Sequence, residues 1–153
     1  MFERILVPVD GSATSKKGVK EAIAVAKLTG ARIKLLHVWE PPFLAMGTEV
    51  ALLSGEDIYD VSRSAGQRVL SDAVASVKAA GIPVDEQLQE HDGKRLCEQV
   101  AAIAAQWRAS LIVLGSHGRR GLSRVLLGSD AEQILRTAPV PVLLVRACEG
   151  PCA

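Results

Sequence analysis

The chain alternates between short apolar runs and longer segments in which apolar residues recur at helical spacing. Most of the runs are almost continuously apolar, which is typical of strands covered on both faces in a parallel sheet. Only the third alternates, so we expect it to be more exposed. The predicted strands are Ile5 to Val9, Ile33 to Val38, Val84 to Leu88, Leu111 to Leu114 and Val142 to Val145.

The segments between these runs have the periodicity of amphipathic helices. Glycine stops the first two, and the last ends before Pro139 and Pro141. An Asp92 cap would precede the third. The predicted helices extend from Val19 towards Gly30, from Ile58 towards Gly81, from Leu96 to Trp107 and from Ala131 to Ala138.

The resulting order, βαβαβαβαβ, predicts the fold class: an α/β single domain with a doubly wound, Rossmann-like sheet of five parallel strands. Ligands of such sheets bind at the carboxyl ends of the strands. The longest irregular stretch, Glu40 to Gly55, contains Pro41-Pro42, Met46-Gly47 and Ser54-Gly55. We expect it to form a flap near that edge.

Composition and charge limit the classes of partner. The 153 residues include 18 basic and 17 acidic side chains that are well mixed, so no charged arm for nucleic acid is indicated. The start, with Glu3 and Arg4 before a strand, is not typical of a signal peptide, and no apolar run approaches the roughly 20 residues of a membrane span. We expect a cytoplasmic protein that binds neither membrane nor nucleic acid, with Cys97, Cys148 and Cys152 as free thiols.

The strongest chemical signal is the glycine-rich segment from Gly115 to Ser129, with the spacing G-x2-G-x9-G-S. Gly115 and Gly118 lack the β-carbons that would keep a phosphate away from backbone N–H groups. Ser129 to Glu132 has the pattern of a capping box, so Gly128-Ser129 should open the last helix and direct its N–H groups at the same phosphates. Arg119, Arg120 and Arg124 lie nearby in the sequence.

Each of these residues has a simpler alternative explanation. The glycines could only make a turn, Ser129 could only cap a helix, and loop arginines or His117 could only be exposed. The position after a buried strand, together with the helix start and the arginines, favours phosphate binding. Asp10, after the first strand, could accept a ribose hydroxyl, help to place a metal ion or cap the first helix. Val38 could offer backbone groups to an adenine edge or belong to the core.

Four segments of the chain resemble the universal stress protein family, and together they extend over nearly all of it. Their spacing G-x2-G-x9-G-S is the version associated with the ATP-binding branch of that family. The matching segments are Ile5-Leu6-Val7-Pro8-Val9-Asp10-Gly11-Ser12, Leu111 to Gly118, Gly121 to Ser129 and Ala138 to Arg146.

The resemblance implies the strand order 3-2-1-4-5, a homodimer joined through the last strand, Val140 to Arg146, and a role in survival under stress. It also implies a universal stress protein domain over residues 1–146. The residues that follow, 147–153, contain Gly and Pro and are predicted to form a flexible tail. Asp10 would lie near the ribose and adenine, Val38 beside the adenine, and Gly115, Gly118, Gly128 and Ser129 on the triphosphate. The predicted ATP site comprises Pro8, Val9, Asp10, Val38, Gly115, Ser116, His117, Gly118, Arg119, Gly128, Ser129 and Asp130.

Asp130 departs from the family pattern, which often has a small apolar residue or threonine there. Its charge suits a helix start but not a neighbouring triphosphate, unless it holds a Mg²⁺ ion that bridges the phosphates. No general base for phosphoryl transfer is evident, and the Walker pattern G-x4-G-K-[ST] is missing from the sequence. We therefore expect a stress-response or regulatory module with slow ATP hydrolysis or none.

Enzymes on related folds are the alternative. An adenylating or ATP-hydrolysing enzyme of this kind would need a glycine- and serine-rich S-G-G-x-D-S loop after the first strand, and Val9 to Ala13 is not one. A phospho-acceptor signalling domain would need an aspartate ending the third strand and a lysine after the last. That strand ends in Glu90-His91-Asp92, and the last strand contains no lysine.

Overall fold

The structure is a computed structural model that describes residues 1–41, 48–116 and 128–146, and only the backbone of residues 48–57. Its elements alternate along the chain as the periodicity predicts. They are β1 (Arg4–Pro8), α1 (Ala13–Thr29), β2 (Arg32–Trp39), α3 (Thr48–Ala79), β3 (Val84–Glu90), α4 (Leu96–Trp107), β4 (Leu111–Gly115), α5 (Ser129–Thr137) and β5 (Val142–Val145).

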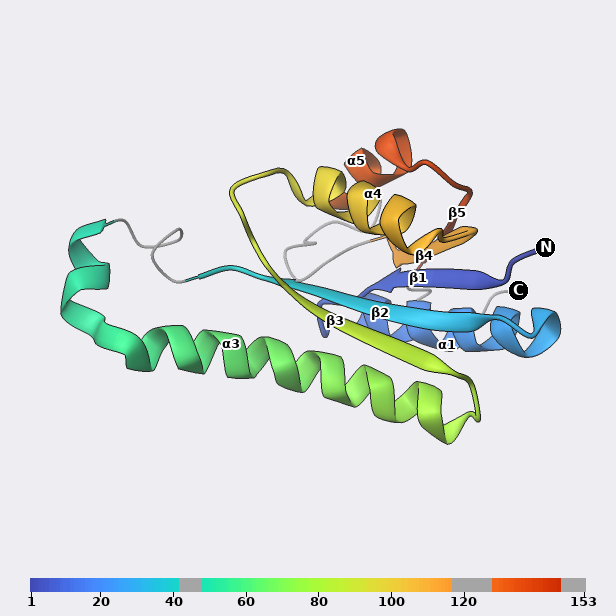
Figure 1. The fold of residues 1–153 in the computed structure, drawn as a ribbon, viewed down its shortest axis with the longest axis horizontal. Coiled ribbons are helices and arrows are strands. Elements are labelled where there is room, and N and C mark those ends of the chain that lie inside the picture. The colour runs from blue at the N-terminus through green and yellow to red at the C-terminus, as the bar shows by residue number, and fades with distance from the viewer. Residues whose placement is uncertain (42–47, 117–127, 147–153) are drawn as a thin grey trace.

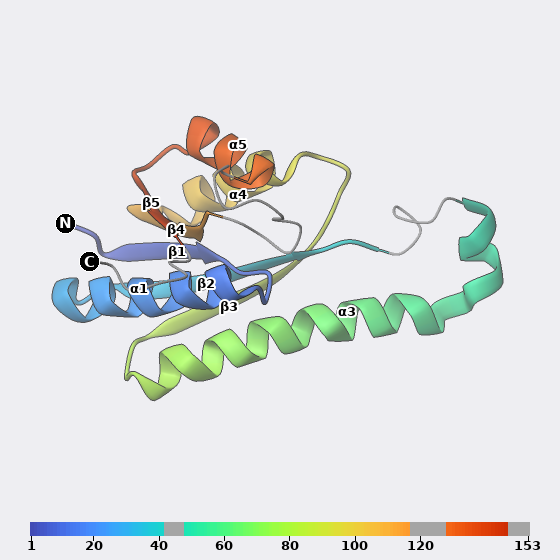
Figure 2. The same cartoon turned by 180° about the vertical axis from the view of Figure 1, so that it is seen from behind.

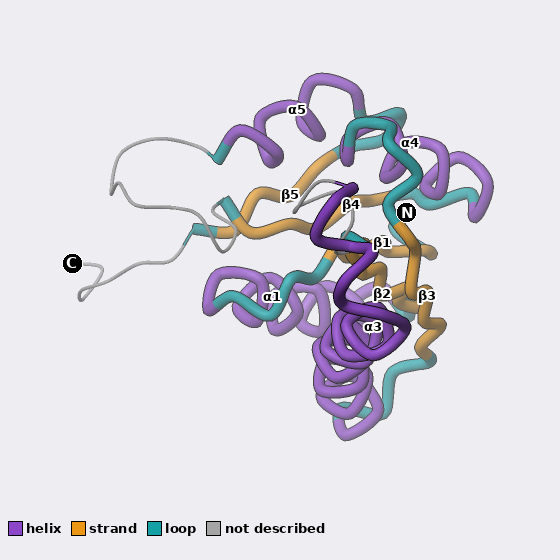
Figure 3. The backbone as a smooth tube through the Cα atoms, turned by 90° about the vertical axis from the view of Figure 1, so that its left-hand side faces the viewer, coloured by secondary structure: helices purple, strands orange, loops and turns teal. Residues whose placement is uncertain are grey.

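All five strands form one parallel sheet in the order β3-β2-β1-β4-β5. Helices α4 and α5 cover one face, and α1 and α3 cover the other (Figure 1). The view from behind shows the same layers, with α3 extending past the sheet (Figure 2). Seen along the strands, the sheet separates the two helix pairs (Figure 3). The predicted fold class and strand order are confirmed.

Side-chain alternation along the strands produces two cores. Ile5, Val7 and Leu35 point toward α1 and α3, whereas Leu6 and Leu36 point toward α4 and α5. Because β1 is covered on both faces, its apolar run is nearly continuous. The edge strand β3 is nowhere fully buried, as its alternating sequence predicts.

Several predicted boundaries are wrong. The stretch expected to be irregular, Glu40 to Gly55, is helical from Thr48, because one interior glycine costs a helix only about 1 kcal/mol and good helix formers surround Gly55. Residues 42–47 of the predicted flap lie outside the described residues. Asp92 does not cap α4: the helix starts three residues later, after Arg95, whose N–H donates to the Glu98 carboxylate at 3.3 Å.

The start of α5 also differs from prediction. Gly128 is the N-cap and Ser129 is already the first helical residue, so the capping box expected on Ser129 does not form. A glycine at this position adopts the cap backbone but has no side chain to bond the first N–H groups. The predicted tail, 147–153, and the segment 117–127 lie outside the described residues. No helix in the described part of the chain has the length and apolarity to cross a membrane.

Candidate functional site

A crevice opens where the strand order reverses, between β1 and β4. Pairing between β1 and β2 continues to Pro8 opposite Leu36, whereas pairing between β1 and β4 stops at Leu6 opposite Ile112. The two central strands therefore separate toward their carboxyl ends. This is the position at which open α/β sheets bind ligands.

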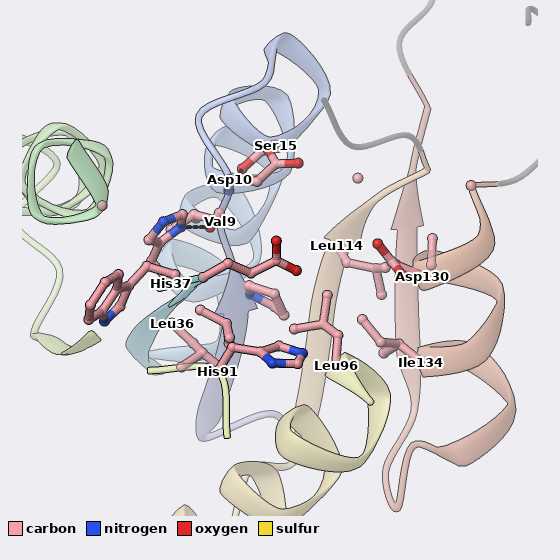
Figure 4. Close-up of a pocket in the computed structure, with 18 of the residues that line it drawn as sticks. Val9, Asp10, Ser15, Leu36, His37, His91, Leu96, Leu114, Asp130 and Ile134 are labelled. Carbon is pink, nitrogen blue, oxygen red and sulfur yellow. Dashed lines mark hydrogen bonds between the residues drawn. The ribbon is translucent and has the colours of Figure 1, made fainter. Parts of the chain in front are cut away.

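A cavity of about 620 Å³ occupies this crevice, which is within the usual size for a small-molecule site. Figure 4 shows His37 from β2 and Asp130 from α5 on opposite sides of it. The lining residues are Pro8, Val9, Asp10, Ser15, Leu36, His37, Val38, Trp39, Glu40, Ser62, Ala65, Gly66, His91, Leu96, Leu114, Gly115, Gly128, Ser129, Asp130, Ala131 and Ile134.

The turn after β1 forms a hydrogen-bonded wall. The Asp10 carboxylate accepts the Ser12 N–H at 2.9 Å, and the Asp10 N–H donates to the Ser15 hydroxyl at 3.2 Å. Ser12 is the N-cap of α1, and its hydroxyl accepts the Ser15 N–H at 3.1 Å. Gly11 has a φ of 80°, which a residue with a side chain rarely adopts. The turn thus holds Asp10 at the cavity without using it as the helix cap.

The end of β2 forms the opposite wall. Val38 is half-buried at the cavity, and the neighbouring His37 is buried on the other face of the sheet, toward α3. The Nδ1 atom of His37 lies 2.6 Å from the Val9 carbonyl oxygen. Because a carbonyl only accepts, Nδ1 carries the proton of this bond. The imidazole therefore connects the ends of β1 and β2.

Contacts between α3 and the strand ends extend this wall. Trp39 and Tyr59 pack edge to face with centroids 4.9 Å apart. The Tyr59 hydroxyl donates to the Glu90 carboxylate at 2.8 Å, and that bond raises the pKa of Tyr59. The Ser62 hydroxyl donates to the Glu40 carbonyl at 3.1 Å. These contacts place the cavity-lining residues of α3 against β2 and β3.

The loop after β3 continues along the cavity from His91. The Asp92 carboxylate accepts the Lys94 N–H at 3.1 Å, and this bond lowers the pKa of Asp92. The ring of His91 accepts the N–H of Gly93 through Nδ1 at 3.2 Å. Asp92 therefore closes a local turn ahead of α4.

The third wall consists of β4 and the start of α5. A β-carbon on Gly115 would lie 2.9 Å from the Thr14 carbonyl carbon, so glycine is required here by the close approach of α1. The Gly128 N–H donates to the Ser116 carbonyl at 2.9 Å, which ties the helix start to the end of β4. The first N–H groups of α5 have no intrahelical partner and no capping side chain, so this end of the cavity suits an anion.

Acidic groups dominate the charge of the described lining. Asp10, Glu40 and Asp130 carry carboxylates, and no lysine or arginine lines the cavity among the described residues. Among the described residues, backbone N–H groups are therefore what this wall offers an anion, and Arg119, Arg120 and Arg124 of the sequence prediction lie outside the described residues. Apolar side chains of Leu36, Val38 and Ile134 complete the surface.

Most of the residues predicted as a site lie together. Eight line the cavity: Pro8, Val9, Asp10, Val38, Gly115, Gly128, Ser129 and Asp130. Ser116 is buried next to them, and His117, Gly118 and Arg119 lie outside the described residues. The sequence reasoning missed His37, Trp39 and the residues from α3 and α4. A polar residue inside the apolar run Leu35-Leu36-His37-Val38 is the signal that would have indicated His37.

The model of the universal stress protein family matches residues 1–146. The chain belongs to this family. Among relatives of this universal stress protein, the universal stress protein MJ0531 of Methanocaldococcus jannaschii is 31% identical over 95% of this chain and 83% of its own length. A solved universal stress protein structure from Burkholderia pseudomallei is 32% identical, has a TM-score of 0.74, and is aligned over 95% of this chain and 97% of its own.

Two solved universal stress proteins with nucleotides share the fold at lower identity. One, from Archaeoglobus fulgidus, is in complex with dAMP, is 23% identical and has a TM-score of 0.66 over 95% of this chain and 98% of its own. The other is in complex with cAMP, is 21% identical and has a TM-score of 0.66 over 95% of this chain and 97% of its own.

Proposed function

We propose that this universal stress protein binds an adenine nucleotide, ATP in particular, in the cavity between β1 and β4. The observation that carries the proposal is the combination, in one cavity of about 620 Å³, of apolar strand-end walls with an uncapped helix start. Apolar walls suit a purine, and the helix start suits phosphate. The dAMP and cAMP complexes of the two distant family members support a nucleotide as the ligand class.

Each described wall would hold one part of the nucleotide. Val38 lies beside the base, the Asp10 carboxylate accepts a ribose hydroxyl, and the N–H groups that follow Gly128 donate to phosphate. His117, Gly118 and Arg119 would complete the phosphate site together with Gly115, Ser116 and Ser129. Asp130 would face the phosphates and repel them, and a Mg²⁺ ion held by Asp130 between the phosphates is the alternative.

The role of the site is to bind and report the nucleotide in a stress-response or regulatory setting, with slow hydrolysis or none. The sequence has no Walker pattern G-x4-G-K-[ST] and no evident general base for phosphoryl transfer, which supports a binding role. Phosphate release from ATP over hours, compared with a protein-free control, tests this part. Steady turnover that depends on Asp10 would overturn it and favour the ATP-hydrolysing alternative.

The chain also forms a homodimer through its last strand. Within the described sheet, β5 has a neighbour on one side only, and its Leu143 is 37% exposed. An apolar edge strand with unpaired backbone groups tends to find a partner. The described strand covers Val142–Val145 of the predicted contact, Val140 to Arg146.

Calorimetric titration with ATP and GTP tests the proposed ligand. We expect binding to favour ATP, because the strand-end wall beside Val38 offers backbone groups suited to an adenine edge. Asp10→Asn should weaken ATP binding about fivefold, since the amide oxygen still accepts a hydrogen bond but a bond to a charged group is about 1 kcal/mol stronger. Asp85→Asn is the matched control, because Asp85 pairs with Arg32 on the outer strand, away from the cavity. Equal affinities for both nucleotides, or no binding at millimolar concentration, would reject the proposal.

A further inference from the structure

The backbone edge of β2 continues past the end of β1. Even-numbered residues of β2 face β1: the Arg32 N–H donates to Glu3, and the Leu36 carbonyl accepts the Val9 N–H. Odd-numbered residues face β3, as the bond from the His91 N–H to the Trp39 carbonyl shows. Val38 therefore directs its N–H and C=O toward the β1 side, where β1 has already ended at Pro8.

A continued parallel ladder would use the Val38 N–H to bond the Val9 carbonyl, because the Val9 N–H already donates to Leu36 at 2.8 Å. That bond is absent between these two described residues. The Val9 carbonyl accepts the Nδ1–H of His37 instead, at 2.6 Å, as Figure 4 shows. A side-chain N–H thus bonds this carbonyl at the point where a continued ladder would place the next backbone N–H.

The His37 ring is held in this position from behind. It is 7% exposed, and its other edge lies against Gly66 of α3. A β-carbon on Gly66 would come within 2.9 Å of His37 Cδ2 and 3.2 Å of Trp39 Cβ, so a larger residue would displace the ring. The ring position and its bond to Val9 therefore depend on close packing between α3 and β2.

We propose that His37 is a positioning residue for nucleotide-base recognition: by bonding the Val9 carbonyl, it leaves the backbone edge of Val38 open to the base. The inference rests on the proposed function, since it explains how the strand end beside the cavity becomes a hydrogen-bonding edge. One N–H and one C=O on the same residue match the N6–H donor and a neighbouring ring-nitrogen acceptor of adenine, whereas guanine has the acceptor O6 in place of N6–H. His37 itself does not touch the ligand in this role.

His37→Phe and His37→Asn test the role as a matched pair. Phenylalanine keeps the ring but lacks the donor, so the Val38 N–H becomes able to bond Val9. Asparagine places its amide N–H close to the position of Nδ1 and should keep the bond. We expect phenylalanine to reduce the ATP-to-GTP affinity ratio about tenfold, and asparagine to restore most of it. A loss of selectivity by both folded variants, or by neither, would overturn the inference.

Amide exchange at Val38 gives a second readout, which can be measured in the unmodified protein and in His37→Phe. In the nucleotide-free protein we expect the Val38 amide to exchange faster than that of Leu36, and ATP should slow it. In His37→Phe the same amide should be protected without nucleotide. A Val38 amide already protected in the unmodified, nucleotide-free protein would overturn the role of His37. Failure of ATP to bind at all would reject the proposed function while leaving this exchange test of the backbone edge valid.

Discussion

At the scale of single residues, Asp130 is where charge and the proposed ligand conflict. It is exposed in the first turn of α5 and lines the cavity. If a phosphate oxygen lay about 5 Å away, repulsion at an effective dielectric of about 20 would be roughly 3 kcal/mol per unit charge before solvent screening. We expect Asp130→Val to tighten ATP binding about tenfold, which needs about 1.4 kcal/mol, and to tighten AMP binding less.

Glu132→Gln is the matched control for Asp130. Glu132 lies in the same helical turn, but it pairs with Arg136 at 2.8 Å and does not line the cavity. Its substitution should leave ATP affinity within a factor of about two, because its charge is paired with Arg136 and lies outside the cavity lining. If Asp130 instead holds Mg²⁺, Asp130→Val will weaken ATP binding only when the metal is present. Titrations with and without Mg²⁺ distinguish tighter from weaker ATP binding by Asp130→Val. An unchanged affinity in both conditions would contradict the placement of phosphate at α5.

Some residue roles could not be predicted from the sequence because they depend on neighbours that are distant along the chain. Gly115 was predicted for phosphate access, yet its missing β-carbon is required by contact with Thr14. His37 was not predicted because its partner, Val9, is 28 residues away. Asp10 was predicted at the cavity because a strand end at the switch point depends only on the order of elements.

At the scale of elements, the contact between α1 and β4 gives a stability prediction with an internal control. A β-carbon on Gly115 would meet the backbone of Thr14 at 2.9 Å, whereas one on Gly18 would lie 3.6 Å from Gly115 N, the nearest atom outside its own helix. Gly115→Ala should therefore lower the free energy of unfolding by about 1–3 kcal/mol. Gly18→Ala, inside α1, should raise it by about 0.5–1 kcal/mol.

Urea denaturation followed by circular dichroism measures both changes. The two glycines lie against each other, so the comparison separates close packing from the helix preference of alanine. A stabilising Gly115→Ala would mean that α1 and β4 do not approach this closely. In that case, phosphate access, which the sequence suggested, would be the remaining reason for a glycine at position 115.

The presence of each helix could be predicted from the spacing of apolar residues, whereas the residue at which each helix starts could not. The apolar stripes indicated every described helix, because burial of one face determines the element. The starts depend on local backbone bonds: α4 begins after Arg95 and α5 after Gly128, although Asp92 and Ser129 are stronger capping residues. In α3, helix formers upstream of Gly55 outweighed the glycine that suggested a loop.

At the scale of the whole molecule, the fold followed from the order of elements. Alternating strands and helices with short connections allow few topologies, and right-handed crossovers lead to helices on both faces. The strand order β3-β2-β1-β4-β5 came from the family resemblance and is confirmed by the pairing. The position of the cavity could also be predicted, because it lies at the carboxyl ends of the strands, where the strand order reverses at β1. The walls contributed by α3 and α4 required the packed structure.

The homodimer remains a prediction, and the register of β5 provides its test. The Pro141 and Val145 carbonyls accept N–H groups of Ile112 and Ser116, so alternation directs the Leu143 N–H toward β4 and the Val142 N–H toward the open edge. Val142→Pro should therefore leave the monomer folded and, in sedimentation experiments at micromolar concentration, shift the unmodified dimer to monomer. Leu143→Pro is the control, because it removes a bond to β4 and should lower the melting temperature. A monomeric unmodified protein, or a Val142→Pro variant that stays fully dimeric, would mean that β5 is not the interface.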